Sequence, residues 1–412
     1  MISLDLENML VCRSILSNEL VQELMAASAQ QDDLGLSHAF AGHLIEQAEN
    51  EGWSGNLIRA LFLHLLSQEG CLAAKMAEAS KGQIGLSLKR AFIHDIKKLM
   101  PALFSPATSI INISILDNYE PSIPHTLEAT QFLNKQLQGC TTPEAVTDAF
   151  LCFYQKYGYG EIASYQAFSW DSKHQKLHGI RHFEAMDFED IIGYKRQKEQ
   201  LINNTMAFIN KKPANNVLLV GARGTGKSSG VKALAKAYYT EGLRLLQMQK
   251  SQLSELPKIM SVLRQYASKR FIIFFDDLSF EESDSNYKYL KSAIEGGVES
   301  CPENVLIYAT PNRRHLIRET WRDRTDEQDE LFRNDSINET ISLSDRFGII
   351  ITYLEPTQAE YLDIIDHFLQ QEGVHLDREE LRILGHRWNL EHSGRSGRSA
   401  RQFVTHYLGQ LK

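Results

Sequence analysis

Residues 221–228 of this 412-residue chain have the types and spacing of a phosphate-binding loop. They read Gly-Ala-Arg-Gly-Thr-Gly-Lys-Ser and fit the pattern GxxxxGK(S/T), between an apolar strand pattern and a helical pattern. The glycines let backbone N–H groups approach phosphate oxygens, and the helix N-terminus favours their negative charge. We expect Lys227 to reach the β- and γ-phosphates of a nucleotide and Ser228 to ligate Mg²⁺. The predicted nucleotide contacts are Gly221, Ala222, Arg223, Gly224, Thr225, Gly226, Lys227, Ser228 and Ser229.

Two acidic residues follow another strand pattern, about 50 residues after the loop. Residues 271–275 are continuously apolar, and Asp276 and Asp277 come next. Since ligands of open α/β sheets bind at the carboxyl ends of the strands, we expect this pair beside the loop. Asp276 is the candidate for holding Mg²⁺ through water, and Asp277 is the candidate for polarising a water that attacks the γ-phosphate. The alternative is that Asp277 only begins the next loop.

Strand and helix patterns alternate from residue 216 to residue 354 and predict an α/β fold. Continuous apolar strands between helices indicate a parallel sheet with helices on both faces. Only helical patterns occur before residue 155 and after Pro356, and residues 158–180 have the pattern of a β-hairpin. The predicted strands are 216–220, 243–248, 271–275, 305–309 and 348–354, and the predicted helices after the loop are 227–239, 253–267, 287–299, 359–371, 378–389 and 400–411.

Two pairs of residues that contain histidine lie outside these motifs. His178 and His182 are four residues apart, but no third metal ligand lies near them in the sequence. His94 and Asp95 are adjacent, and we expect both on a solvated helix face. The sequence therefore predicts no metal site apart from that of Ser228 and Asp276.

From about residue 187 to residue 412 the motifs resemble those of an AAA+ ATPase. Residues 305–312, VLIYATPN, resemble the sensor 1 strand, and Asn312 matches the polar residue that helps to place the attacking water in that family. Residues 342–348, SLSDRFG, resemble the segment with the arginine finger, which implies that Arg346 reaches the ATP of a neighbouring subunit. The alternatives are a turn former for Asn312 and a surface cation for Arg346.

The resemblance extends to the segments on either side of this core. Residues 190–194, DIIGY, resemble the segment that packs near adenine, which implies that Ile192 and Gly193 lie there. The C-terminal helices resemble the AAA+ lid, and Arg398 matches its sensor 2 arginine, with Arg401 as the runner-up and a solvated arginine as the alternative. More narrowly, the strings NNVLLVGARGTGKSS, DDLSFEE, VLIYATPNRRHL and SLSDRFG look like an uncharacterised group of bacterial AAA+ proteins, classed as a domain of unknown function.

Asp277 departs from the general AAA+ pattern, in which Glu is usual at this position. Its side chain is one methylene shorter, so its carboxylate must approach the water differently or act through a second water. This difference bears on the rate of hydrolysis more than on ATP binding. An alternative is therefore an assembly switch, which binds ATP but hydrolyses it slowly.

The patterns and the resemblance together predict an α/β P-loop NTPase (AAA+) fold. A three-layer parallel-sheet core carries a C-terminal helical lid and follows a mostly helical N-terminal domain. A mixed-charge stretch, residues 319–338, is expected to be a solvated loop or, alternatively, a partner-contacting insertion. The expected boundaries are 1–157 for the helical domain, 158–186 for the hairpin and linker, 187–356 for the nucleotide-binding domain and 357–412 for the lid.

Composition argues against several classes of protein. With 44 Lys and Arg against 52 Asp and Glu, the net charge of −8 disfavours a general nucleic-acid coat protein, and no nucleic-acid-binding motif stands out. Five scattered cysteines suggest neither a disulfide framework nor a zinc ribbon. The N-terminus lacks the pattern of a signal peptide, and no apolar run approaches the ~18 residues of a membrane span. We therefore expect a cytoplasmic protein.

The function expected from these observations is hydrolysis of ATP to ADP and phosphate with Mg²⁺. The resemblance implies an oligomer, in which a ring is possible, that remodels or switches a partner macromolecule. The N-terminal domain is the candidate for binding a protein partner, and nucleic acid remains open as a target. The alternatives are an ATP-dependent assembly switch or scaffold and a P-loop small-molecule kinase.

Overall fold

The computed structural model describes residues 2, 4–30, 33–125, 127–278, 287–295, 301–311, 346–392 and 394–410. The chain forms two compact units. The first, called here the helical unit, contains Met1–Tyr165 together with Gln265–Lys269. The second, called the sheet unit, contains Gln166–Arg264 and Arg270–Lys412. The chain therefore returns to the helical unit for one short segment in the middle of the sheet unit.

Helix α8 (Pro143–Tyr157) packs against α4, α5, α7 and α9 in the helical unit. Thr142 caps its N-terminus, and Phe150, Tyr154 and Tyr157 recur at helical spacing on its buried face. These rings contact one another or their neighbours on α5 and α7 and form an aromatic centre. The other helices of this unit are α1 (Glu19–Ala29), α2 (Leu34–Glu51), α3 (Leu57–Gln68), α4 (Leu72–Ala79), α5 (Leu86–Phe104), α6 (Ala107–Ile110), α7 (Glu128–Leu137) and α9 (Glu161–Ser164).

Asp95 on α5 is fully buried, which corrects the expectation of a solvated His94–Asp95 pair. Its carboxylate accepts hydrogen bonds from the backbone N–H groups of Leu10 (2.8 Å), Val11 (2.7 Å) and Cys12 (2.9 Å). His94 stays 45% exposed, with Nδ1 3.1 Å from the same carboxylate. The bonded N–H groups lie 83–85 residues earlier in the chain. A helical pattern around Asp95 alone carries no information about such a distant partner.

The described strands of the sheet unit form one sheet in the order β2-β1-β4-β5-β6-β3-β7. β1 and β2 are an antiparallel hairpin, and every other neighbouring pair is parallel. The expected hairpin thus extends the sheet beyond β4, although the start of its predicted range 158–180 contains helix α9 (Glu161–Ser164). The strands are β1 (Ala167–Asp171), β2 (Lys176–Gly179), β3 (Val217–Gly221), β4 (Leu243–Met248), β5 (Arg270–Leu278), β6 (Val305–Pro311) and β7 (Ile349–Tyr353).

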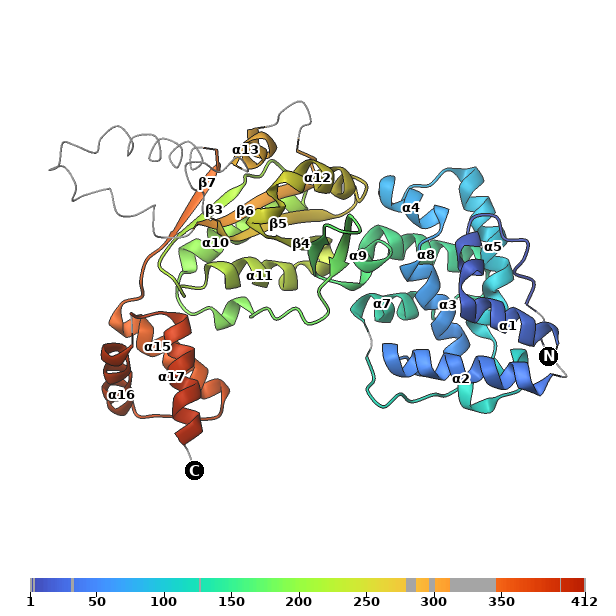
Figure 1. Ribbon diagram of the computed structural model, residues 1–412, viewed down its shortest axis with the longest axis horizontal. Coiled ribbons are helices and arrows are strands. Elements are labelled where there is room, and N and C mark those ends of the chain that lie inside the picture. Colours follow the sequence, from blue (N-terminus) through green and yellow to red (C-terminus); the bar gives the residue numbers. More distant parts are fainter. Residues whose placement is uncertain are drawn as a thin grey trace. The chain divides into compact units, whose positions relative to one another are not determined.

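Helices cover both faces of this sheet, as the continuous apolar strands predict. Figure 1 shows α10 (Lys195–Ile209) and α11 (Lys227–Ala237) on one face and α12 (Leu256–Arg264) and α13 (Tyr287–Glu295) on the other. On the first face, Leu201 and Val231 belong to a core with residues of β3, β4, β5 and β6. On the second, the buried residues of α12 recur every three or four positions: Leu256, Ile259, Met260 and Leu263. The three layers hold the carboxyl ends of the strands at one edge.

Three helices follow the sheet and form the lid: α15 (Gln358–Gln371), α16 (Arg378–Glu391) and α17 (Gly397–Gln410). The first begins with a capping box, in which Thr357 and Glu360 each bond the backbone of the other. Buried side chains of α15 and α17, with Leu381 of α16, form a separate apolar cluster. The lid therefore has a core of its own beside that of the sheet.

Within the described residues, no single helix is both long and apolar enough to cross a membrane. One bent pair, α3 followed by α4, meets the criterion by length and composition alone. The two helices meet at an angle of 46° and carry many buried residues of the helical unit, among them Leu61, Phe62 and Leu66.

We expect Asp95→Ala to lower the stability of the helical unit by about 3 kcal/mol, because it leaves buried N–H groups without an acceptor. Urea unfolding and hydrogen exchange of the Leu10, Val11 and Cys12 amides measure the effect. Asp148→Ala removes an exposed carboxylate that pairs with Lys89 on the same unit, and it should change stability little. Equal effects of the two substitutions would show that Asp95 does not hold the N-terminal segment.

Candidate nucleotide-binding site

The loop between β3 and α11 has the backbone of a phosphate-binding loop. Gly221, Gly224 and Gly226 have φ angles of 131°, 72° and 87°, which L side chains rarely adopt. A Cβ on Gly221 would lie 1.9 Å from the carbonyl oxygen of Tyr353 on β7. α11 begins at Lys227, immediately after the last of these glycines. The glycines of the motif are therefore required by the path of the chain, and the loop ends at a helix N-terminus.

Side chains of the loop fold over its backbone. The Lys227 ammonium donates hydrogen bonds to the carbonyl oxygens of Gly221 (3.0 Å) and Ala222 (2.5 Å). The buried Thr225 hydroxyl donates to the same Ala222 oxygen at 2.8 Å. These bonds hold the lysine ammonium at the loop itself, where a phosphate would lie.

The Asp276 carboxylate joins three elements at the carboxyl edge of the sheet. Its Oδ1 accepts hydrogen bonds from the Ser228 hydroxyl of α11 (2.7 Å) and the Thr310 hydroxyl of β6 (2.7 Å). The Thr310 oxygen also accepts the backbone N–H of Asp277 at 2.9 Å. The sequence places Ser228, Asp276 and Asp277 together, and the structure does the same. Thr310 is not among the residues predicted from sequence, although a polar residue after five apolar ones is a visible signal.

Asp277 occupies an unusual backbone conformation. Its φ is 59°, and the register between β5 and β6 shifts between Phe275 and Leu278, as in a β-bulge. Non-glycine residues in this left-handed region cost free energy and are concentrated at functional sites. The bulge leaves the side chains of Asp276 and Asp277 exposed at the end of a buried strand.

The donor atoms at this point suit Mg²⁺. Mg²⁺ takes oxygen ligands and is held by one or two protein side chains together with waters and substrate phosphates. The Ser228 hydroxyl and the Asp276 carboxylate supply such oxygens, and they already lie within hydrogen-bond distance of each other. Elsewhere in the described chain, no group of three or more His, Cys, Asp or Glu side chains could hold a metal ion.

The segment before α10 passes close to the loop. A Cβ on Gly226 would lie 3.3 Å from the Ile191 side chain, whereas Ile192 packs against the apolar cluster of the lid. Gly193 has a φ of 78°, and Tyr194 follows with its hydroxyl donating to the Leu354 carbonyl oxygen at 2.7 Å. Burial raises the pKa of Tyr194 to about 12, so the phenol remains a donor at neutral pH. Ile191 is thus nearer to the loop than the predicted Ile192.

The lid touches the loop at the start of α17. The Gly397 N–H donates to the Gly224 carbonyl oxygen at 2.9 Å. A Cβ on Gly224 would lie 2.8 Å from the Ser396 hydroxyl and 3.2 Å from the Cβ of Arg398. The Cβ of Arg398 therefore lies beside the loop. Arg401 lies one turn further along and is stacked over the Phe368 ring at 4.9 Å.

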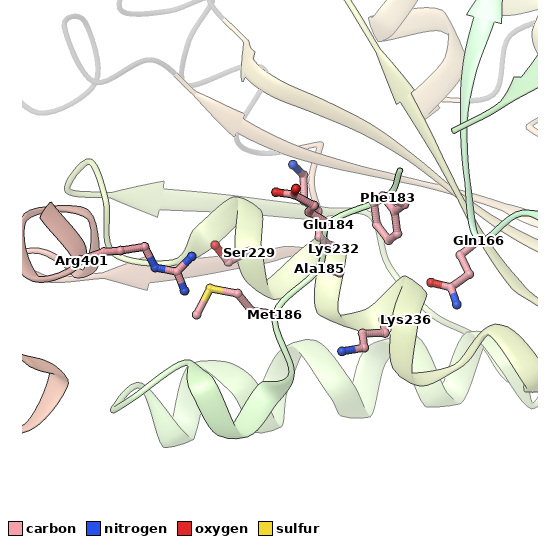
Figure 2. A pocket seen from close by; sticks show the side chains of 9 residues that line it. All are labelled: Gln166, Phe183, Glu184, Ala185, Met186, Ser229, Lys232, Lys236 and Arg401. Atoms are coloured by element: carbon pink, nitrogen blue, oxygen red, sulfur yellow. The ribbon is translucent and has the colours of Figure 1, made fainter. Parts of the chain in front are cut away.

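An open pocket of about 610 Å³ lies along α11, next to the loop. Figure 2 shows Ser229 at the end nearest the lid, with Arg401 and Met186 on either side of it, and Gln166 at the other end. Lys236 in this pocket is paired with Asp187 at 2.8 Å. The lining residues are Gln166, Phe183, Glu184, Ala185, Met186, Ser229, Lys232, Lys236 and Arg401.

Of the remaining predicted residues, the structure describes Arg346, which lies away from this constellation. Asn312 and the mixed-charge stretch 319–338 fall outside the described residues. Arg346 lies three residues before β7, at the amino edge of the sheet, whereas the loop lies at the carboxyl edge. The register pairs Gly221 with Tyr353 at the end of β7 opposite to Arg346, and the strand from Ile349 to Tyr353 is about 13 Å long. Arg346 therefore lies at the opposite edge of the sheet from the loop of its own chain.

The protein family described as "Protein of unknown function (DUF815)" matches residues 163–411. The chain belongs to the DUF815 family. In this DUF815 protein the strand that carries the phosphate loop, β3, lies between β6 and β7, and a helical lid follows the sheet. The expected fold is confirmed: a three-layer α/β core with a phosphate loop, a C-terminal helical lid and a helical N-terminal region, in a family of unknown function.

Similar solved structures come from several kinds of protein. The RuvB Holliday junction branch migration motor of Thermotoga maritima is 18% identical with a TM-score of 0.38, and the match covers 55% of this chain and 65% of that chain, less than two thirds of its length. PCH-2 of C. elegans is 17% identical (TM-score 0.38; 54% and 65% covered). The FIGL-1 AAA domain in complex with ADP is 18% identical (TM-score 0.38; 54% and 72% covered). No curated protein matches the chain.

The backbone conformation at Asp277 predicts that a glycine variant is more stable than an alanine variant there, which reverses the order found in helices. Asp277→Gly should be more stable than Asp277→Ala by about 1 kcal/mol, because only glycine adopts a φ of 59° without strain. At exposed Asp363 in α15 the ordinary helical order should hold, with alanine more stable than glycine by about 1 kcal/mol. Thermal or urea unfolding of the four variants measures both differences. The same order at both positions would contradict strain at Asp277.

Proposed function

We propose that this chain binds ATP with Mg²⁺ and hydrolyses it to ADP and phosphate. The observation that carries the proposal is the set of bonds around Asp276, which joins Ser228 of the phosphate loop to Thr310 and to the backbone of Asp277. A phosphate loop, two oxygen donors for a metal and a second carboxylate, that of Asp277, thus meet at one strand edge. These are the groups that phosphoryl transfer to water requires.

The triphosphate would lie on the backbone N–H groups of the loop. Lys227 and Arg398 would neutralise its charge, one from α11 and the other from the lid helix that bonds Gly224. Ser228 and Asp276 would hold Mg²⁺, which when bound neutralises charge on the β- and γ-phosphates. Lys227 would exchange its bonds to Gly221 and Ala222 for bonds to phosphate oxygens.

The adenosine would leave the loop on the side of Ser229, where the segment before α10 and the lid approach α11. Ile191 lies beside Gly226 and Ile192 packs against the lid cluster, and the pocket opens along α11 from Ser229. The Met186 thioether lies at the lid end of that pocket, as Figure 2 shows, and such a group packs well on a purine ring. The shape and size of the pocket suit a small ligand with both polar and apolar parts.

In the hydrolytic step a water oxygen forms a bond to the γ-phosphorus, and the bond from that phosphorus to the β–γ bridging oxygen breaks. The electron pair of the broken bond leaves with ADP. Asp277 would orient the water and accept its proton, with Asn312 as its second contact. The Thr310 hydroxyl oxygen accepts the backbone N–H of Asp277 and so helps to position the backbone that carries the Asp277 carboxylate. Water serves as the acceptor here, which separates this reaction from that of a small-molecule kinase.

The arginine finger would come from a second copy of the chain. Arg346 lies at the amino edge of the sheet, before β7, and its own loop lies at the carboxyl edge, beyond the roughly 13 Å from Ile349 to Tyr353. A neighbouring copy can present its amino edge to this loop, whereas the same chain cannot. We therefore propose an oligomer, in which a ring is one arrangement, with a catalytic site completed between subunits. The helical unit would then be free to bind the protein partner.

Asp277→Asn should retain ATP binding and reduce phosphate release about 100-fold, because the amide cannot accept a proton. Asp277→Glu restores the usual AAA+ side chain and should keep at least the wild-type rate. Phosphate release without any added acceptor measures the reaction, and fluorescent-nucleotide titration measures binding. If the wild type binds ATP without releasing phosphate even as an oligomer, the assembly switch replaces the ATPase as the function.

Mixing two inactive variants tests the role of Arg346. Lys227→Ala removes nucleotide binding but keeps Arg346, and Arg346→Ala keeps the loop, so each alone should lose about 10³-fold or more of the rate. A mixture should regain part of the wild-type activity, since one copy supplies the loop and its neighbour the arginine. Mixing Arg346→Ala with the double variant Lys227→Ala/Arg346→Ala is the matched control and should stay inactive. A mixture no more active than this control would eliminate action between subunits.

A further inference from the structure

The segment Gln265–Lys269 connects the two units of the chain through its covalent path. It follows α12 and precedes β5, which both belong to the sheet unit, yet its own contacts lie within the helical unit. The Tyr266 ring lies 5.9 Å from the Tyr159 ring of the helical unit. No motif in the sequence indicates that this segment belongs to the helical unit. None of its residues is part of the nucleotide site described above.

Polar contacts fix this segment to α4 and α8. Glu78 of α4 and Lys269 are both fully buried, with Glu78 Oε2 3.4 Å from the Lys269 ammonium. The other Glu78 oxygen, Oε1, accepts the Ser268 hydroxyl (2.6 Å) and the Ser268 backbone N–H (3.1 Å). Lys269 also donates to the carbonyl oxygen of Gln155 at 2.9 Å. We refer to Glu78, Ser268 and Lys269 as the buried clamp.

The surroundings of the clamp are closely packed. Gly158 ends α8 with a φ of 87°, and a Cβ there would lie 3.3 Å from the Lys269 side chain and 3.4 Å from the Glu78 carboxylate. Taking both charges out of water is costly, so removal of one partner leaves the other buried and uncompensated. A fully buried ion pair is weak evidence for added stability but defines a single geometry well. The clamp therefore holds Ser268 and Lys269 against Glu78 within the helical unit.

β5 runs from the clamp to the nucleotide site. Lys269 immediately precedes the strand, and Asp276 lies seven residues later, about 23 Å away along an extended chain. The residues between them, Phe271–Phe275, are fully buried and paired on both sides, with β4 and with β6. Such a strand transmits an axial displacement, because its core packing prevents it from bending. The first residue of the strand, Arg270, is held by the sheet unit through the carbonyl oxygens of Gly242 and Glu303.

We propose that Glu78 and Lys269 are positioning residues for ATP turnover, through which the helical unit sets the position of Asp276 and Asp277. The proposal rests on the ATPase function above and adds its regulation. A protein partner that binds the helical unit and displaces α4 or α8 acts on the strand that carries both catalytic carboxylates. By linkage, nucleotide at the other end of β5 changes the stability of the clamp by the same free energy.

The test compares hydrogen exchange and steady-state kinetics of the full chain in wild type, Glu78→Gln and Lys269→Met. In the wild type, ATP with Mg²⁺ should change the exchange rate of the Ser268 and Lys269 amides. Glu78→Gln should abolish that nucleotide-dependent change and lower kcat about fivefold with little change in KM for ATP. Glu78→Asp, which keeps the charge, should restore part of kcat. Asp148→Asn, on the exposed pair with Lys89, is the matched control and should behave as wild type.

An unchanged nucleotide response in Glu78→Gln, or an unchanged kcat, would overturn the coupling. A loss of kcat that accompanies an equal loss of ATP affinity or of active fraction would assign the clamp a merely structural role. Should the charge variants fail to fold, Ser268→Ala removes one donor and leaves the ion pair in place; its nucleotide response must then be weakened for the proposal to stand. The proposed function fails separately, if the wild type itself binds no ATP.

Discussion

The hydrogen bonds that converge on the Asp276 carboxylate are the interaction on which this account depends. They tie the helix after β3, the end of β5 and the end of β6 into one group at the carboxyl edge of the sheet. Parallel strands are required for that arrangement, since only then do successive strands end at the same edge. The buried strands, the two helical layers and the lid that bonds Gly224 all serve to hold this edge in place.

Much of the fold follows from local patterns. The glycines of the loop, the apolar run 271–275 and the alternation of helices with strands predict β3, α11, β4 and β5 close to their observed bounds. They succeed because each depends on neighbours in the sequence, such as a required φ or a strand buried on both faces. Ser228, Asp276 and Asp277 meet for the same reason. Which lid arginine contacts phosphate stays a proposal: the Cβ of Arg398 lies beside Gly224, and Arg401 lines the pocket together with Ser229.

The features that the sequence does not reveal depend on distant contacts. Asp95 is part of an ordinary helical pattern, and only the N-terminal segment that it binds makes it a buried residue. The hairpin gives no sign that it will pair with β4, since edge pairing is specified by backbone groups that all residues share. The sequence pattern of Gln265–Lys269 likewise predicts only a connection between a helix and a strand, and not its contacts with the helical unit. Thr310 is intermediate, because its polarity is visible but its partners are not.

The most direct test of the central claim is calorimetric titration of the wild type and Ser228→Ala with ATP, in the presence and absence of Mg²⁺. The account predicts one ATP for each wild-type chain and affinity that rises about tenfold when Mg²⁺ is added. Ser228→Ala should bind ATP alone as the wild type does and lose the effect of Mg²⁺. Absence of binding to the wild type, or an equal effect of Mg²⁺ on both proteins, would contradict a metal–nucleotide site at Asp276 and Ser228.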